Sequence, residues 1–165
     1  MKLETLHDLY INELHDLYDA ENQIVKALPK MIESSQSTEL RTALSNHLEE
    51  TQTQVRRLEQ IFEMHGEDIK GEKCKGLRGI IDEGEDLIKH DDNLDVRDAA
   101  IIAAAQKVEH YEIAGYGTVR TWAEMMGHER AAQLLQETLN EEGEADKKLT
   151  RIARTLNAEA ERGAA

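Results

Sequence analysis

The chain has 165 residues, the usual size of one domain, and its 34 acidic against 20 basic side chains give a formal net charge of −14. An acidic surface repels phosphate backbones and anionic lipid headgroups, which argues against nucleic-acid and membrane partners. The sequence has one proline, one phenylalanine and one tryptophan, and its long segments are rich in Ala, Leu, Glu, Lys and Gln. This composition is typical of an all-α protein, so we expect one all-α domain spanning residues 1–165.

Two further features bear on the compartment. Cys74 is the only cysteine, so no disulfide can form within the chain and nothing indicates an oxidising environment. The N-terminus carries acids from Glu4 onward, unlike a signal peptide, and the sequence has no run of about 18 apolar residues. We expect a soluble, cytoplasmic protein.

The first predicted helix covers residues 3–33, where apolar side chains recur every three or four positions. Pro29 is expected to kink it near its end. Glu21 occupies a slot on its apolar stripe, in line with Leu14, Leu17, Ile24 and Leu28. A carboxylate in such a slot is costly to bury unless it is paired, protonated or bound to a cation.

A second helix is predicted over residues 38–65. Ser35 or Ser37 is its candidate N-cap, and Gly66 is a suitable C-terminal cap. A polar segment near the middle of this helix contains no apolar side chain.

That segment, EETQTQ, interrupts the apolar stripe of the second helix, so the side chains that face the core there must be polar. His47, Glu50 and Gln54 share one face of the helix through their i, i+3 and i+7 spacing. We take these three as the candidates for inward-facing polar groups.

The next stretch, residues 69–95, contains several glycines, and its apolar side chains support one short helix between loops. We interpret it as a crossover. A third long helix is predicted over residues 96–126 and a fourth over residues 129–156. The tight turn at Gly127 between them makes the two helices antiparallel neighbours.

The apolar stripes of these last two helices also contain acids. Glu109 and Glu112 lie one turn apart on the inward face of the third helix. Glu142 interrupts the stripe of the fourth helix, and Asp146 lies one turn further on. Every long helix therefore has an acid about midway along its apolar face.

Four long helices, with short links except for one long crossover, predict a four-helix bundle with the connectivity of ferritin-like folds. Antiparallel packing would bring the midway acids to one level, where their mutual repulsion requires counter-charge. No lysine or arginine lies on the inward stripes. A dinuclear centre of two divalent ions, bridged by carboxylates, accounts for this arrangement, and an oxygen-rich ligand set suits Fe or Mn.

Four segments of the chain carry a resemblance to a known family. They are LYDAENQIVKALPKM, HLEETQTQVRRLEQIF, RDAAIIAAAQKVEHYEIAGYGT and LLQETLNEEGEADKKLTRIA. The sequence resembles the YciE and YciF family of bacterial stress-associated, ferritin-like proteins over nearly its whole length. The resemblance implies a ferritin-like bundle related in fold to rubrerythrins and other diiron proteins, and a homodimer.

By comparison with a rubrerythrin-like site, the resemblance implies ligand roles for five glutamates. These are Glu21 on the first helix, Glu50 as a bridging carboxylate on the second, Glu109 and Glu112 on the third, and Glu142 on the fourth. A Glu-x-x-His motif would place histidines at positions 53 and 145, where this chain has threonine and alanine. His47 precedes Glu50 by the same spacing and could replace one of these histidines, and Gln54 and Asp146 are the remaining substitutes.

Several other residues bear on ligands and assembly. The histidines without ligand spacing are His7, His15, His65, His90, His110 and His128. Tyr116 could hydrogen-bond a ligand or serve as a core residue. Leu9, Ile11 and Val25 lie off the core stripe of the first helix and are candidates for a dimer surface.

Three functions remain open from the sequence. The first is a diiron or dimanganese oxidoreductase that consumes peroxide or dioxygen or oxidises Fe(II). The second is a non-catalytic, dimeric stress protein with a vestigial or structural metal site. The third, iron storage or DNA protection by a cage, requires assembly surfaces that the sequence does not reveal, and the net charge opposes DNA binding.

Overall fold

The computed structural model describes residues 3–89 and 93–162, which form five α-helices and no β-strand. The helices are α1 (Leu6–Ser34), α2 (Thr38–His65), α3 (Lys75–Ile88), α4 (Leu94–Met125) and α5 (Glu129–Arg162). The predicted all-α class is confirmed. The last helix continues to Arg162 instead of ending at Leu156, because the residues that follow Leu156 include good helix formers and no breaker.

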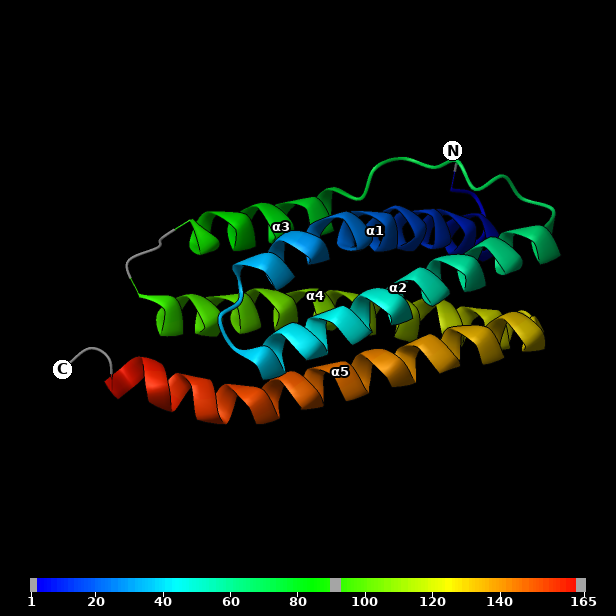
Figure 1. The fold of residues 1–165 in the computed structure, drawn as a ribbon. Helices are drawn as coiled ribbons and strands as arrows, with labels where there is room; N and C mark the ends of the chain where they lie inside the picture. The colour runs from blue at the N-terminus through cyan, green and yellow to red at the C-terminus, as the bar shows by residue number, and fades with distance from the viewer. Residues whose placement is uncertain (1–2, 90–92, 163–165) are drawn as a thin grey trace.

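The four long helices, α1, α2, α4 and α5, lie side by side, and each runs antiparallel to the two that it contacts (Figure 1). α1 contacts α2 and α4, and α5 contacts the same two helices, so the four surround a common interior. α3 lies outside this ring, against α4 and α1, within the long connection from the end of α2 to the start of α4.

Local sequence signals account for the helix ends. Thr5 and Asp8 form a capping box at the start of α1, with Asp8 N donating to Thr5 Oγ1 at 3.1 Å and Thr5 N donating to Asp8 Oδ2 at 2.8 Å. Ser37, one of the two predicted candidates, is the N-cap of α2. Gly66 ends α2 in the left-handed conformation, with φ of 67°. Pro29 does not end α1, which continues to Ser34.

The interior consists of two apolar clusters. The first apolar cluster includes Ile24, Leu44, Ile102 and Ile152, together with the inner face of α3. The second apolar cluster lies towards the turn between α4 and α5 and includes Leu14, Leu58, Val119 and Leu135. Along each long helix, the residues between the two clusters include buried polar side chains. We call this level of the interior the polar layer.

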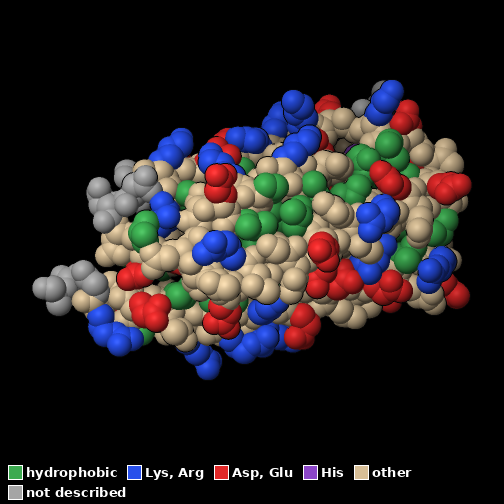
Figure 2. Space-filling view, in the orientation of Figure 1, with side chains coloured by type: hydrophobic (Ala, Val, Ile, Leu, Met, Phe, Trp, Pro, Cys, Tyr) green, Lys and Arg blue, Asp and Glu red, His purple; other side chains and the backbone are tan. Residues whose placement is uncertain are grey.

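The outer surface is mixed. Figure 2 shows acidic and basic side chains interspersed over one face, with hydrophobic side chains gathered near the middle of that face. Among the described residues, no helix combines the length and apolar character needed to cross a bilayer. Ile11 differs from the sequence prediction, because it is 2% exposed and belongs to the second apolar cluster rather than to the outer surface.

Candidate metal centre

The polar layer receives buried acids from three of the four long helices and a histidine from the fourth. Glu21 on α1, Glu109 and Glu112 on α4, and Glu142 on α5 are all at most 2% exposed, and His47 on α2 is 7% exposed. Each follows its helix's apolar periodicity, so burial of the stripe carries the polar residue inward. The sequence predicted that five glutamates converge here; the structure buries these four at one level of the interior and leaves the fifth, Glu50, exposed.

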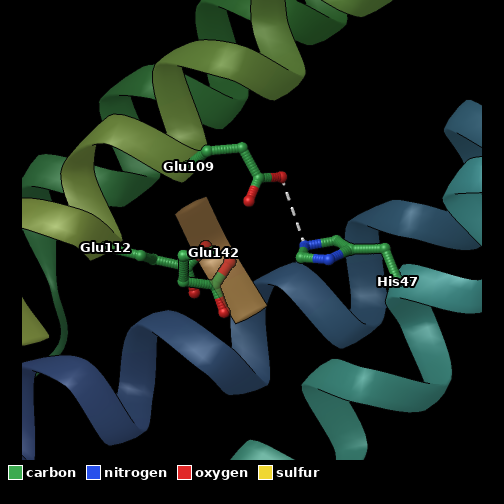
Figure 3. A group of neighbouring side chains, drawn as sticks. All are labelled: His47, Glu109, Glu112 and Glu142. Carbon is green, nitrogen blue, oxygen red and sulfur yellow. Dashed lines mark ion pairs between the residues drawn. The ribbon is translucent and has the colours of Figure 1, made fainter. Parts of the chain in front are cut away.

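Four of these side chains form a compact group. Each of His47, Glu109, Glu112 and Glu142 offers one ligand atom, and these atoms lie within 4.8 Å of one another. Figure 3 shows the three carboxylates and the imidazole directed into one space, with His47 Nε2 3.3 Å from Glu109 Oε1. Carboxylate oxygens and an imidazole nitrogen at these separations can bind one divalent transition-metal ion.

Several oxygen atoms of the polar layer are buried without a hydrogen-bond partner among the described residues. They are Glu21 Oε2, Glu109 Oε2, Glu142 Oε2 and both carboxylate oxygens of Glu112. A buried acceptor without a partner is destabilising, and a buried carboxylate without a counter-charge more so. A bound cation would give a partner to the carboxylates of Glu109, Glu112 and Glu142, whose ligand atoms lie together, so the donor set fits a metal.

The electrostatics agree with the geometry. Desolvation raises the pKa of Glu21, Glu109 and Glu112 well above the usual range, and the charge of Glu142 raises each of the three further. Burial also raises the pKa of Glu142. In the described part of the chain, no lysine or arginine forms a salt bridge with these four carboxyls. Without metal, the layer therefore favours protonated carboxyls, whereas a cation would favour the ionised form.

Neighbouring polar side chains orient two of the carboxylates. The hydroxyl of Tyr116, buried on α4, donates to Glu21 Oε1, and the amide of Gln54 donates to Glu142 Oε1. The same Gln54 amide lies 3.1 Å from Glu141 Oε2. Arg57 holds Glu141 in turn through two hydrogen bonds of 2.5 and 2.7 Å. Gln54 is thus inside the layer as predicted, although its contact is with a carboxylate.

Two predicted site residues, Glu50 and Asp146, are not buried in the polar layer. The side chain of Glu50 is 49% exposed, and its carboxylate is 3.8 Å from His47 Nδ1 on the solvent side. Asp146 is partly buried and accepts a hydrogen bond of 3.0 Å from the amide of Gln106, and it is not a member of the compact group.

The buried face of α2 in this region consists of His47, Thr51 and Gln54. The sequence interpretation took the i+3 neighbour of His47, Glu50, for the inward position. The spacing of Leu44 and Leu58 would have indicated the correct face, because the series 44, 47, 51, 54, 58 alternates steps of three and four. Thr51 donates its hydroxyl hydrogen to His47 O at 2.8 Å, which satisfies a polar group that would otherwise be buried alone.

A cleft of about 310 Å³ leads towards the compact group from the surface between α2 and α5. His47 and Glu109 line its inner part, and Glu50, Glu141 and Glu144 contribute acids to its wall. A smaller, mostly apolar pocket of about 40 Å³ between α1, α3 and α4 is also lined by His47 and Glu109. Both solvent and small molecules therefore have short paths to the group.

The fold and the site define an all-helical protein with a buried histidine and glutamate cluster able to hold a metal ion. The chain belongs to the family described as Domain of unknown function (DUF892), which matches residues 5–161. It is 46% identical to Protein YciF of Escherichia coli (strain K12) over 154 residues, which cover 93% of both chains. The resemblance to the YciE and YciF family is thereby confirmed.

Solved structures show the same relationship. The crystal structure of the E. coli stress protein YciF has a TM-score of 0.90 and 45% identity, covering 94% of this chain and 98% of that one. A Rhodopseudomonas palustris protein named YcfI, provisionally titled a structural protein, has a TM-score of 0.88 and 46% identity over 90% of this chain and 95% of its own. A protein from Xanthomonas campestris pv. campestris shares the fold at 20% identity and a TM-score of 0.75, covering 98% of this chain and 100% of its own.

Proposed function

We propose that this chain is a ferritin-like four-helix-bundle protein whose polar layer holds two divalent ions, Fe or Mn, bridged by carboxylates. The observation that carries the proposal is the set of buried carboxylate oxygens that, among the described residues, have no hydrogen-bond partner and no salt bridge with a lysine or arginine. A structural polar core would pair such atoms, because each one left unpaired reduces stability. Binding two cations neutralises about four carboxylates at once.

The ligand roles follow from position. His47, Glu109, Glu112 and Glu142 would bind directly, since their ligand atoms already lie within 4.8 Å of one another. Glu21 supplies a further carboxylate, oriented by the Tyr116 hydroxyl. Glu50 remains a proposed ligand at the rim of the site, beside the Nδ1 atom of His47.

We propose that the site acts on a small oxidant, with peroxide or dioxygen as substrate, or oxidises Fe(II). The bound ions would supply the redox chemistry, as Fe and Mn do in oxygen-rich sites. The protein holds a proton on the Tyr116 hydroxyl, directed at Glu21, and one apolar cluster lies on each side of the layer along the bundle. The cleft between α2 and α5 is wide enough for such small molecules.

Metal analysis of protein purified without chelator, combined with peroxide-consumption and Fe(II)-oxidation assays, tests this function. We expect close to two Fe or Mn ions per chain and turnover that disappears when the ions are removed and returns when they are restored. Metal-free protein that does not retain either ion after incubation with excess metal would refute the proposal.

One observation favours a second function, a non-catalytic stress protein with a structural metal site. The compact group has a single histidine, and Glu50 lies outside it, so fewer ligands are available to tune redox chemistry than the family comparison implies. Solved relatives are titled a stress protein and, provisionally, a structural protein. Bound metal without turnover of peroxide, dioxygen or Fe(II) would favour this function.

We also propose that the protein is a homodimer located in the cytoplasm. The half-buried Leu9 and Val25 on α1, and the hydrophobic side chains near the middle of the face in Figure 2, offer surface for a second copy. Analytical ultracentrifugation at micromolar concentration should show twice the chain mass of 18.7 kDa. A single species at the chain mass would exclude the dimer.

A further inference from the structure

Three histidines meet at the end of the molecule beyond the second apolar cluster. His7 lies in the first turn of α1, His65 in the last turn of α2, and His128 in the turn between α4 and α5. The ring centroids are 4.5 Å apart for His65 and His128, and 6.0 Å apart for each pair that includes His7. The three residues are far apart in the chain, so spacing along the sequence indicated no partner for any of them.

We infer that His7, His65 and His128 together bind one late first-row divalent ion, such as Zn²⁺. Metal–nitrogen bonds of about 2.0–2.1 Å put the ring centroids of three ligating imidazoles about 4.5–5.2 Å apart, for ligand angles between octahedral and tetrahedral. The His65 and His128 rings already satisfy this separation. Both longer distances involve His7, so movement of that one side chain completes the site.

The backbone around the three histidines is held by well-formed helix ends. The capping box of Thr5 and Asp8 fixes the first turn of α1. Gly66 and Gly127, with φ of 67° and 76°, close α2 and α4, and His128 N donates to Ala123 O at 2.8 Å. The backbone that carries the three rings is therefore already ordered before metal binds, which lowers the entropic cost of binding.

The surroundings favour a neutral imidazole ligand. Tyr10 Oη lies 3.2 Å from His65 Nε2, so it can accept the hydrogen on Nε2 and leave the Nδ1 lone pair for a metal. Burial, followed by the charges of His128 and His7, lowers the pKa of His65. In the described part of the chain, the ion pairs that include a histidine are those of His47 and His110, and Asp8 and Glu67 interact with His7 and His65 through charge alone.

This histidine site is separate from the polar layer. His7 and Glu21 are about 21 Å apart along α1, at 1.5 Å per residue. The two sites also differ in chemistry, because imidazole nitrogens suit Zn²⁺, Ni²⁺ and Cu²⁺, whereas an oxygen-rich set suits Fe and Mn. Three protein ligands leave positions for water or another exchangeable ligand.

A zinc titration of the full chain, in competition with a chromophoric chelator, tests the inference. The variants are His7→Asn and His128→Asn, with His110→Asn as the matched control, since His110 is 67% exposed on α4. We expect each of the first two variants to lose one zinc equivalent or at least about tenfold in affinity for it, given that even outer-sphere partners are worth 10–100-fold. The double variant should lose no more than this one zinc equivalent, because both residues bind the same ion.

Two measurements keep the result interpretable. Circular dichroism should show unchanged helix content in all variants, and zinc-soaked crystals should show an anomalous peak among the three rings. The Glu112→Gln variant should retain this zinc equivalent, so failure here is distinguishable from failure at the polar layer. Unchanged zinc affinity in His7→Asn or His128→Asn, an equal loss in His110→Asn, or no anomalous peak would overturn the inference.

Discussion

Replacing Glu112 by glutamine separates a metal site from an ordinary polar core. Glu112 is 1% exposed, and neither of its carboxylate oxygens has a hydrogen-bond partner among the described residues. Glutamine has nearly the same shape but removes the negative charge and one ligand oxygen. We expect metal affinity to fall by at least about tenfold, the lower end of the range for perturbed outer-sphere groups, and any turnover to fall with metal content.

The metal-free variant should be no less stable than the metal-free parent. In the parent, desolvation and the charges of Glu142, Glu21 and Glu109 raise the pKa of Glu112 in the folded state. Above the unfolded pKa, the unfolded chain releases this proton before the folded chain does, so the carboxyl reduces stability by up to about 1.4 kcal/mol per pH unit until the folded pKa is reached. Glutamine removes this penalty, and its amide hydrogens can donate to the neighbouring carboxylates.

Urea unfolding at neutral pH, with and without chelator, measures both effects alongside metal analysis. Glu124→Gln is the matched control, because Glu124 is exposed on the same helix and pairs with Arg120 at 2.7 Å. That change should leave metal content intact and alter the free energy of unfolding by less than about 1 kcal/mol. The reasoning is refuted if Glu112→Gln retains metal as the parent does, or if its metal-free form unfolds more easily.

Three further predictions concern stability. With chelator present, the free energy of unfolding should decrease as pH rises above about 4.5. The pKa values of the polar-layer carboxyls are raised in the folded state, so the unfolded chain loses these protons at lower pH than the folded chain does. Urea unfolding at a series of pH values in which stability increases with pH would contradict this prediction. Gly84→Ala should destabilise the protein by about 1–3 kcal/mol, because its new Cβ would lie 2.9 Å from Ala104 Cβ. Gly79→Ala in the same helix has open space around the new Cβ and should stabilise the protein by up to about 1 kcal/mol. The Tm values of the two variants should therefore shift in opposite directions. Asp98→Asn should lower the free energy of unfolding by about 1–2 kcal/mol. Buried Asp98 accepts hydrogen bonds from the backbone N–H groups of residues 36 and 37 at 2.9 and 2.7 Å. An unchanged urea midpoint would show that the charge of this carboxylate contributes nothing to stability.

The midway acids could be found from sequence because they break an otherwise apolar helical stripe. A stripe is a local property, and its 3.6-residue period identifies the buried face of α4 and α5 without tertiary information. Where the stripe lapses, as in the polar segment of α2, the buried face has to be found from the apolar residues on either side. The sequence interpretation placed Glu50 on that face beside His47 and Gln54, and the structure buries Thr51 instead of Glu50.

Contacts between distant residues were not accessible in the same way. Ile11 lay off the strongest stripe of the first helix and was assigned to a dimer surface, but neighbouring helices bury it in the second apolar cluster. His7, His65 and His128 had no ligand spacing along the chain, although they meet in space. Their proximity depends on where three helix ends arrive, and spacing within one helix carries no information about that.

The sequence by itself determined the all-α class, the approximate positions of the four long helices and four of the five proposed buried glutamates, because capping residues, breakers and apolar periodicity act over a few neighbouring positions. Only the tertiary structure decided which polar atoms are left without partners and which side chains meet. Partners such as Tyr116 for Glu21, Gln54 for Glu142, and the histidines at the helix ends come from different helices. Such pairings depend on the relative rotation and height of packed helices, which is set by the fit of both apolar clusters together.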